Sequence, residues 1–153
     1  MSDMEVDSMS GCDNAAGGCK QTGNSIIGIG VDAVDIGRFE RALAKAPELS
    51  ERLFVESERG LPAESLAARF AAKEAVAKAL GAAGTEPGPE EQARPWSLSW
   101  HDVIVHNKKN GAPALELIGE AATRAAASGI NRWHISLTHD GGMALAFVIG
   151  EQI

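Results

Sequence analysis

Charged side chains gather in one alanine-rich stretch, residues 69–81, at spacings that could serve phosphate chemistry. Glu74 and Lys78 are four residues apart, as are Arg69 and Lys73, so in a helix the two members of each pair share a side. One carboxylate among three cations suits a site that balances a metal ion against several phosphate charges. The same spacing fits an ordinary surface helix with Glu–Lys pairing, and spacing alone favours that interpretation.

Acidic and imidazole side chains also stand at the ends of expected strands. Asp32 ends an apolar run, and His139 with Asp140 lies at the last hairpin. Carboxylates from separate elements suit Mg²⁺, which takes one or two protein carboxylates together with water and substrate phosphates. Asp32 and Glu74 are such a pair. A single histidine at a strand end, in contrast, is more often a hydrogen-bonded structural residue.

Other familiar catalytic and nucleotide-binding motifs do not fit the sequence. Gly28 and Gly30 lack the third glycine of a dinucleotide-binding loop, and close backbone packing within a strand explains them more simply. No Gly-Lys-Ser or Gly-Lys-Thr occurs, which excludes a Walker loop. Ser136 and His139 are too close on one expected strand for a Ser-His-acid triad, and there is no nucleophile elbow.

The elements that must position these groups are helices mixed with antiparallel hairpins. Apolar periodicity and turn residues predict, in order, a strand 25–32, a helix 36–46, short helical turns within 49–60, a long helix 63–80, strands 98–105 and 113–118, a helix 119–128, and a hairpin 133–139 and 143–149. Asp35 is expected to cap the first helix and Gly81 to end the long one. We therefore predict an α+β fold with the long helix packed on an antiparallel sheet.

Composition indicates one globular domain that needs no disulfide or structural metal. The chain has 153 residues, of which 44% are hydrophobic and 23% charged. Its net charge of −7 argues against nucleic acid as the main partner, because phosphate neutralisation needs a basic surface. No apolar run reaches membrane-spanning length, so no membrane partner is expected. The first residues lack the apolar core of a secretory signal, and a cytoplasmic location is expected.

Two segments are expected to lie outside the packed core. Residues 1–24 have no apolar periodicity and are predicted to form a disordered tail before the folded domain, 25–153. Cys12 and Cys19, in that tail, match no zinc or redox spacing and receive no role. The segment 81–95, rich in Pro and Gly, is predicted to be a mobile surface loop.

Three motifs, in this order and separation, resemble holo-acyl-carrier-protein synthase, the small branch of the 4′-phosphopantetheinyl transferases. They are Gly28-Ile-Gly-Val-Asp32 with Asp35 and Arg38 behind it, Arg69-Phe-Ala-Ala-Lys-Glu-Ala-Val-Ala-Lys78, and Ile135-Ser-Leu-Thr-His139-Asp140. The resemblance spans about residues 26–151. It implies the fold of that family and transfer of the phosphopantetheine arm of coenzyme A to a serine of an apo acyl carrier protein. The product would be 3′,5′-ADP, and the process served would be fatty acid synthesis.

The resemblance also implies roles for individual residues. Asp32 and Glu74 match the Mg²⁺ ligands. Lys78 would meet the phosphates and stabilise or protonate the leaving group. Positions near the nucleotide and its phosphates are matched by Arg69, Lys73, Lys78 and His139, and catalytic positions by Glu74, Lys78 and His139. The general base for the serine stays open: a metal-bound water is expected, with Asp35 and Glu58 as minor candidates.

Partner and assembly follow from the same resemblance. Arg38, Arg41 and Lys45 share a side of the helix predicted at 36–46 and would give an acidic enzyme a cationic strip for an acidic carrier protein. A solvated helix face explains each of these residues equally well. The longer branch of the family has two related halves, whereas this chain carries a single set of motifs. A homotrimer with active sites between subunits is therefore implied.

One departure and two other functions stay open. The turn Gly111-Ala-Pro113 stands where the family often has Gly-Lys-Pro, and Lys108 or Lys109 could replace the missing cation. The chain could instead be a Mg²⁺-dependent nucleotide pyrophosphohydrolase acting on coenzyme A-like substrates. It could also be a non-catalytic oligomeric scaffold in which Glu74 only pairs with Lys78.

Overall fold

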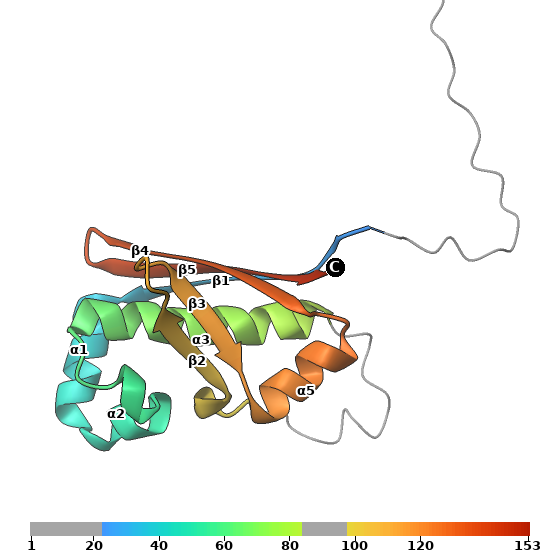
Figure 1. The fold of residues 1–153 in the computed structure, drawn as a ribbon. Coiled ribbons are helices and arrows are strands. Elements are labelled where there is room, and N and C mark those ends of the chain that lie inside the picture. The colour runs from blue at the N-terminus through green and yellow to red at the C-terminus, as the bar shows by residue number, and fades with distance from the viewer. Residues whose placement is uncertain (1–22, 84–97) are drawn as a thin grey trace, which may run out of the picture.

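The computed structural model describes residues 23–83 and 98–153 of the chain (Figure 1). The predicted tail up to residue 22, with Cys12 and Cys19, lies outside the described residues, as does the predicted loop from residue 84 onward. In the part that is described, no helix has both the length and the apolar character needed to cross a membrane.

Two antiparallel sheets and one long helix form the frame of the molecule. The elements are β1 (Ser25–Asp35), α1 (Ile36–Lys45), α2 (Glu48–Leu53), η1 (Glu56–Glu58), α3 (Ala63–Ala83), η2 (Trp100–Asp102), β2 (Val103–Asn107), β3 (Pro113–Leu117), α5 (Gly119–Ala127), β4 (Arg132–Asp140) and β5 (Met143–Gln152). One sheet has the order β1-β5-β4 and the other is the β2-β3 hairpin. Helix α3 runs along one face of the larger sheet, and the hairpin crosses α3 (Figure 1). The predicted α+β fold is confirmed.

Most element boundaries follow the local sequence, with three exceptions. The Asp35 side chain caps α1 by accepting a 2.7 Å hydrogen bond from the backbone N–H of Arg38, as predicted. Helix α3 does not end at Gly81, because a helical glycine costs only about 1 kcal/mol and packing against β1 outweighs that cost. Strand β1 continues beyond Asp32 to Asp35, since its pairing with β5 runs that far. The strand predicted from residue 98 starts only at Val103, after the turn η2.

The close approach of β1 to α3 decides where the polar groups of both elements lie. A Cβ atom added to Gly30 would stand 1.8 Å from the carbonyl oxygen of Ala75, and one added to Gly28 would stand 2.3 Å from that of Ala79. Both contacts are with helix backbone, so they leave no room for a side chain. The two glycines, two residues apart on one face of β1, are therefore required for the strand to lie directly on the helix.

A buried ion pair joins α3 to the elements on its other side. The Nζ atom of Lys73 lies 2.8 Å from Oε2 of Glu58, and both side chains are almost completely buried. Lys73 also donates to the carbonyl of Trp100 at 2.9 Å and to that of Val103, while Glu58 Oε1 accepts from the backbone N–H of Val105 at 3.0 Å. Burial lowers the pKa of Lys73, and the neighbouring Glu58 carboxylate opposes that shift. This network ties η1 and β2 to the central helix.

Replacing Gly30 with alanine is expected to destabilise the fold by about 3 kcal/mol, because β1 must move away from the helix backbone. Gly81→Ala is the matched control on α3. Nothing lies within 4 Å of the Cβ that it adds, and it should stabilise the fold by about 0.5–1 kcal/mol. Denaturant unfolding of both variants checks this. Equal stability of the two variants would contradict the close packing.

Replacing Lys73 with methionine should cost about 3–5 kcal/mol of stability, since the Glu58 carboxylate is left buried without its counter-charge. The double variant Glu58→Gln, Lys73→Met carries no buried charge and should recover part of this loss. Thermal unfolding of the wild type and of the two variants measures the loss and its recovery. A double variant less stable than Lys73→Met would show that the ion pair does not account for the loss.

Candidate active site

Three of the predicted site residues meet along the contact between β1 and α3. Side chains alternate along a strand, so Gly28, Gly30 and Asp32 share the face of β1 that is turned to the helix. Asp32 follows the two glycines on this face. It lies next to the part of α3 that carries Glu74 and, one turn later, Lys78. The Lys78 Nζ atom donates to Oδ1 of Asp32 at 2.7 Å. We call Asp32, Glu74 and Lys78 the carboxylate site.

The two carboxylates of this site are close enough to affect each other. The pKa of Glu74 is raised above its ordinary value, first by partial burial and then by the negative charge of Asp32, while Lys78 acts in the opposite direction. Two like charges therefore face one neighbouring cation. Placing carboxylates together in this way disfavours their ionised form unless another positive charge joins them.

The two carboxylates of Asp32 and Glu74 fit a Mg²⁺ ion better than a metal ion whose ligands all come from the protein. No group of three or more His, Cys, Asp or Glu side chains in the described residues could hold a metal ion. Two carboxylates from separate elements match the habit of Mg²⁺, which keeps water and substrate phosphates as its remaining ligands. Asp32 and Glu74 would hold the ion, and the site would be completed by a phosphate-bearing substrate.

Lys78 takes its ionic partner from the strand. The scaffold alternative rested on pairing between Glu74 and Lys78 along the helix. In the structure the ion pair of Lys78 is formed with Asp32, and the same ammonium donates to the carbonyl of Val31 at 2.9 Å. An interaction between elements thus replaces the local one that the spacing alone favoured.

Arg69 lies on another side of α3 from the carboxylate site, because five residues separate it from Glu74. Its guanidinium donates to the carbonyl of Ser65 at 3.3 Å and to Oδ1 of Asn107 at 3.2 Å. Its Nε atom is buried and has no hydrogen-bond partner among the described residues. The sequence indicated Asn107 only as the start of a turn, and nothing local marked it as a partner of Arg69.

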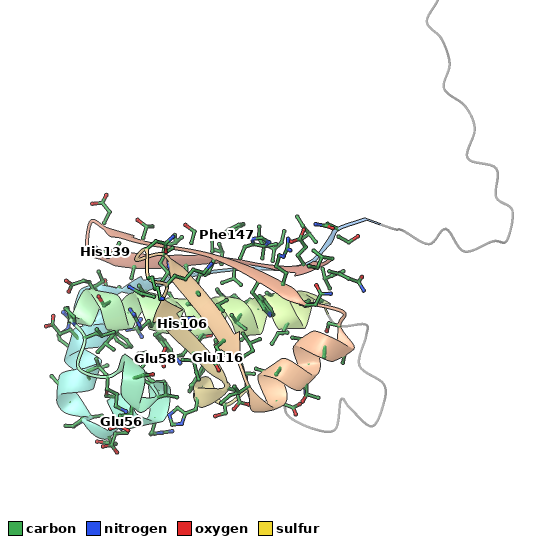
Figure 2. The ribbon with its side chains drawn as sticks, viewed as in Figure 1. Glu56, Glu58, His106, Glu116, His139 and Phe147 are labelled. Carbon is green, nitrogen blue, oxygen red and sulfur yellow. The ribbon has the colours of Figure 1, made fainter. Side chains whose placement is uncertain are left out.

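His139 lies near the end of β4, close to the β4–β5 turn, and its side chain is exposed (Figure 2). It pairs in register with Ala144 of β5, which in turn pairs with Val34 of β1. Strand β5 therefore separates His139 from Asp32. The β2–β3 hairpin packs beside β4, so Arg69 and His139 both belong to the side away from the free edge of β1. We call Arg69 and His139 the basic edge.

Lys73 does not join either group. The sequence placed it near the nucleotide, but its ammonium is fully buried and already binds Glu58 and two backbone carbonyls. These contacts give Lys73 a structural role in the described fold, and its place near the nucleotide stays a prediction. The minor candidates for the general base are also engaged: Glu58 binds Lys73, and Asp35 caps α1. A role of either residue as the base stays a prediction.

The cations expected to dock a carrier protein line the exposed surface of α1. Arg38, Arg41 and Lys45 are all exposed, and within the described ranges none of them forms an ion pair. Helix α1 starts four residues after Asp32, so this strip continues directly from the strand that carries the carboxylate site.

Comparison with known proteins places the chain in a family. The model of the 4′-phosphopantetheinyl transferase superfamily matches residues 28–148. A holo-[acyl-carrier-protein] synthase of Kocuria rhizophila is 51% identical over 126 residues, which cover 82% of this chain and 93% of that protein. The crystal structure of holo-ACP-synthase from Plasmodium yoelii is similar with a TM-score of 0.68 and 25% identity, covering 86% of this chain and 98% of that one.

A further solved structure has a ligand named with it. It is a holo-(acyl-carrier-protein) synthase from Bacillus anthracis in complex with CoA (3′,5′-ADP), with a TM-score of 0.60, 34% identity and coverage of 84% of this chain and 98% of that one. The family model spans most of the described fold, and the relatives agree in name. The chain therefore belongs to the 4′-phosphopantetheinyl transferase superfamily and, within it, to the holo-[acyl-carrier-protein] synthases.

Proposed function

We propose that the chain transfers the phosphopantetheine arm of coenzyme A to a serine of an apo acyl carrier protein, with Mg²⁺ at Asp32 and Glu74. The products are the holo carrier protein and 3′,5′-ADP, and the reaction supplies fatty acid synthesis. The observation that carries this proposal is the meeting of Asp32, Glu74 and Lys78 at the β1–α3 contact. Coenzyme A in the Bacillus anthracis relative supports it as the co-substrate here.

The residues of the carboxylate site divide the chemistry between them. In the reaction, the serine hydroxyl loses its proton to a water molecule, and its oxygen forms a bond to the phosphorus next to the pantetheine arm. The bond from that phosphorus to the bridging oxygen breaks. Asp32 and Glu74 bind and orient the metal, which when bound would neutralise pyrophosphate charge as a Lewis acid. The Lys78 ammonium, half exposed and adjacent to Asp32, stabilises or protonates the departing phosphate oxygen of 3′,5′-ADP.

The basic edge is proposed to act on a coenzyme bound at the carboxylate site of a neighbouring subunit. Within one chain Arg69 and His139 lie on the other side of α3 and β5 from Asp32. The guanidinium of Arg69, whose Nε has no hydrogen-bond partner in the described part of the chain, suits a phosphate oxygen of the nucleotide. Lys108 and Lys109, both exposed in the turn of the β2–β3 hairpin, supply a cation in place of the lysine that the turn Gly111-Ala-Pro113 lacks.

The open face of the larger sheet supports a closed assembly, which we propose to be a homotrimer. Helix α3 covers one face, and Phe147 lies on the other face (Figure 2). Large apolar side chains of β1 and β5 are exposed there, with Phe147 39% and Ile29 50% exposed. The members of this apolar face are Ile29, Val31, Leu145 and Phe147. An exposed apolar patch of this kind is typical of a protein interface. A head-to-tail contact between different surfaces of adjacent subunits forms a ring when the rotation between subunits closes.

Replacing Asp32 with Asn or Glu74 with Gln should lower the rate of carrier modification at least about 100-fold, because the metal and pyrophosphate lose their anchor. The assay combines Mg²⁺, coenzyme A and an apo carrier protein. The mass of the carrier and the amount of 3′,5′-ADP formed are then measured. Glu64→Gln, the same change in the first turn of α3, is the control and should keep full activity. Release of 3′,5′-ADP with no gain in carrier mass would instead indicate a pyrophosphohydrolase, and neither product a scaffold.

Introducing lysine at Phe147 should dissociate the assembly, because a charge cannot be buried at the centre of the apolar face without a partner. Light scattering should show a trimer for the wild-type chain and a smaller species for Phe147→Lys, with activity lost in parallel. Ile118→Lys is the control, since Ile118 is 43% exposed but lies between β3 and α5. A wild-type chain that is monomeric and fully active would overturn the trimer.

Reversing a charge of the α1 strip should weaken carrier docking without affecting the coenzyme. Arg41→Glu is expected to lower kcat/KM for the carrier protein roughly tenfold at low salt, through slower association, and to leave KM for coenzyme A unchanged. Raising the ionic strength should reduce the difference between wild type and variant. A wild-type kcat/KM for carrier that does not change with salt would contradict docking by this strip.

A further inference from the structure

We propose that Lys78 is a built-in counter-ion that holds Asp32 before substrate arrives, so that the coenzyme phosphates and the divalent cation bind cooperatively. This inference rests on the proposed function, in which Asp32 and Glu74 bind the metal. It adds a positioning role for Lys78, exerted through Asp32, to the part that its ammonium plays at the leaving group. The metal site then forms fully only when the substrate phosphates draw Lys78 away.

The geometry of the ion pair places the ammonium where a cation would bind Asp32. Lys78 Nζ is 2.7 Å from Asp32 Oδ1 and 2.9 Å from the carbonyl oxygen of Val31. An ammonium at this oxygen repels a metal ion that approaches the same oxygen. Oδ1 is therefore open to the metal only after the ammonium has moved.

The difference in exposure shows which partner can move. The Lys78 side chain is 54% exposed, whereas that of Asp32 is 18% exposed and belongs to a strand held against the helix backbone through Gly30. A lysine ammonium stands on a flexible four-carbon stem and can change partners without any change in the backbone. Asp32 stays in place, and Lys78 is the group that leaves.

The charges at the site explain why substrate triggers the exchange. Asp32, Glu74 and Lys78 together have one negative charge in excess when all are ionised, which attracts a divalent cation only weakly. Coenzyme A brings several phosphate charges, which offer the ammonium stronger partners than one carboxylate. Because coupling between two binding events is reciprocal, phosphates that release Asp32 raise the metal affinity, and the metal raises the affinity for phosphates.

The first measurement is the affinity of the full chain for Mn²⁺ without coenzyme. The EPR signal of the free ion reports how much Mn²⁺ is unbound. Lys78→Met should bind Mn²⁺ about three- to tenfold more tightly than wild type, a range equal to about 0.6–1.4 kcal/mol. Arg52→Met, which removes one exposed positive charge from α2, is the control for net charge and should match wild type. Adding Asp32→Asn to Lys78→Met should abolish the tight binding and so locate it at this site.

The second measurement repeats the titration with saturating coenzyme A and no carrier protein. The gain in Mn²⁺ affinity on adding coenzyme should be about three- to tenfold larger in wild type than in Lys78→Met, because only wild type must first release Asp32. Equal or weaker Mn²⁺ binding by Lys78→Met without coenzyme, or an equal gain in both proteins, would overturn the counter-ion role. Such results leave the transfer reaction untouched, since that reaction is judged separately by the mass of the carrier.

Discussion

The direct contact between the β1 backbone and α3 is the constraint on which the rest of this structure depends. It exists because Gly28 and Gly30 add no side chain where the carbonyl groups of Ala79 and Ala75 press against the strand. Two residues further along the same face, the strand places the Asp32 carboxylate within 2.7 Å of the Lys78 ammonium. A bulkier strand would stand away from the helix, and the acids of the two elements would no longer face each other.

Adjacent residues of α3 have different roles because different elements pack against the two sides of the helix. Lys73 points into the core, where Glu58 and backbone carbonyls satisfy its charge, and the resulting network stabilises the fold. Glu74 and Lys78 point to the side of β1, where solvent reaches them and their charges are only partly satisfied. The buried pair of Lys73 and Glu58 gains little from a further ligand, because its charges are already satisfied. A partly satisfied group of charges gains from a metal ion and phosphates.

A single chain also separates groups that one substrate would need together. The carboxylate site lies along β1, whereas Arg69 and His139 lie beyond α3 and β5. The uncovered apolar face of the sheet runs across β1 and β5, between these two regions. The same sheet therefore carries Asp32 on the face turned to α3 and exposed apolar side chains on the other face. In the proposed assembly, that apolar face is the interface and the remaining cations meet a neighbouring subunit. Fold and proposed assembly are consequences of one arrangement of strands.

Features that depend on residues near one another in the chain can be predicted from the sequence. Apolar periodicity predicts the helices and strands, Asp35 is predicted to cap α1, and close packing explains the glycine pair. The order of the motifs indicates the family, and the resemblance predicts that Asp32 and Glu74 bind one metal ion together. The extension of α3 past Gly81 and of β1 to Asp35 was not predicted, because packing against other elements outweighs local breakers.

The partners of the lysines depend on contacts between distant parts of the chain. Lys73 meets Glu58, 15 residues away, and Lys78 meets Asp32, 46 residues away. Nothing in the spacing of α3 distinguishes a lysine that will be buried from one that will be exposed. Burial and pairing are set by whatever the fold brings against each side of a helix, and that information is spread over the whole chain.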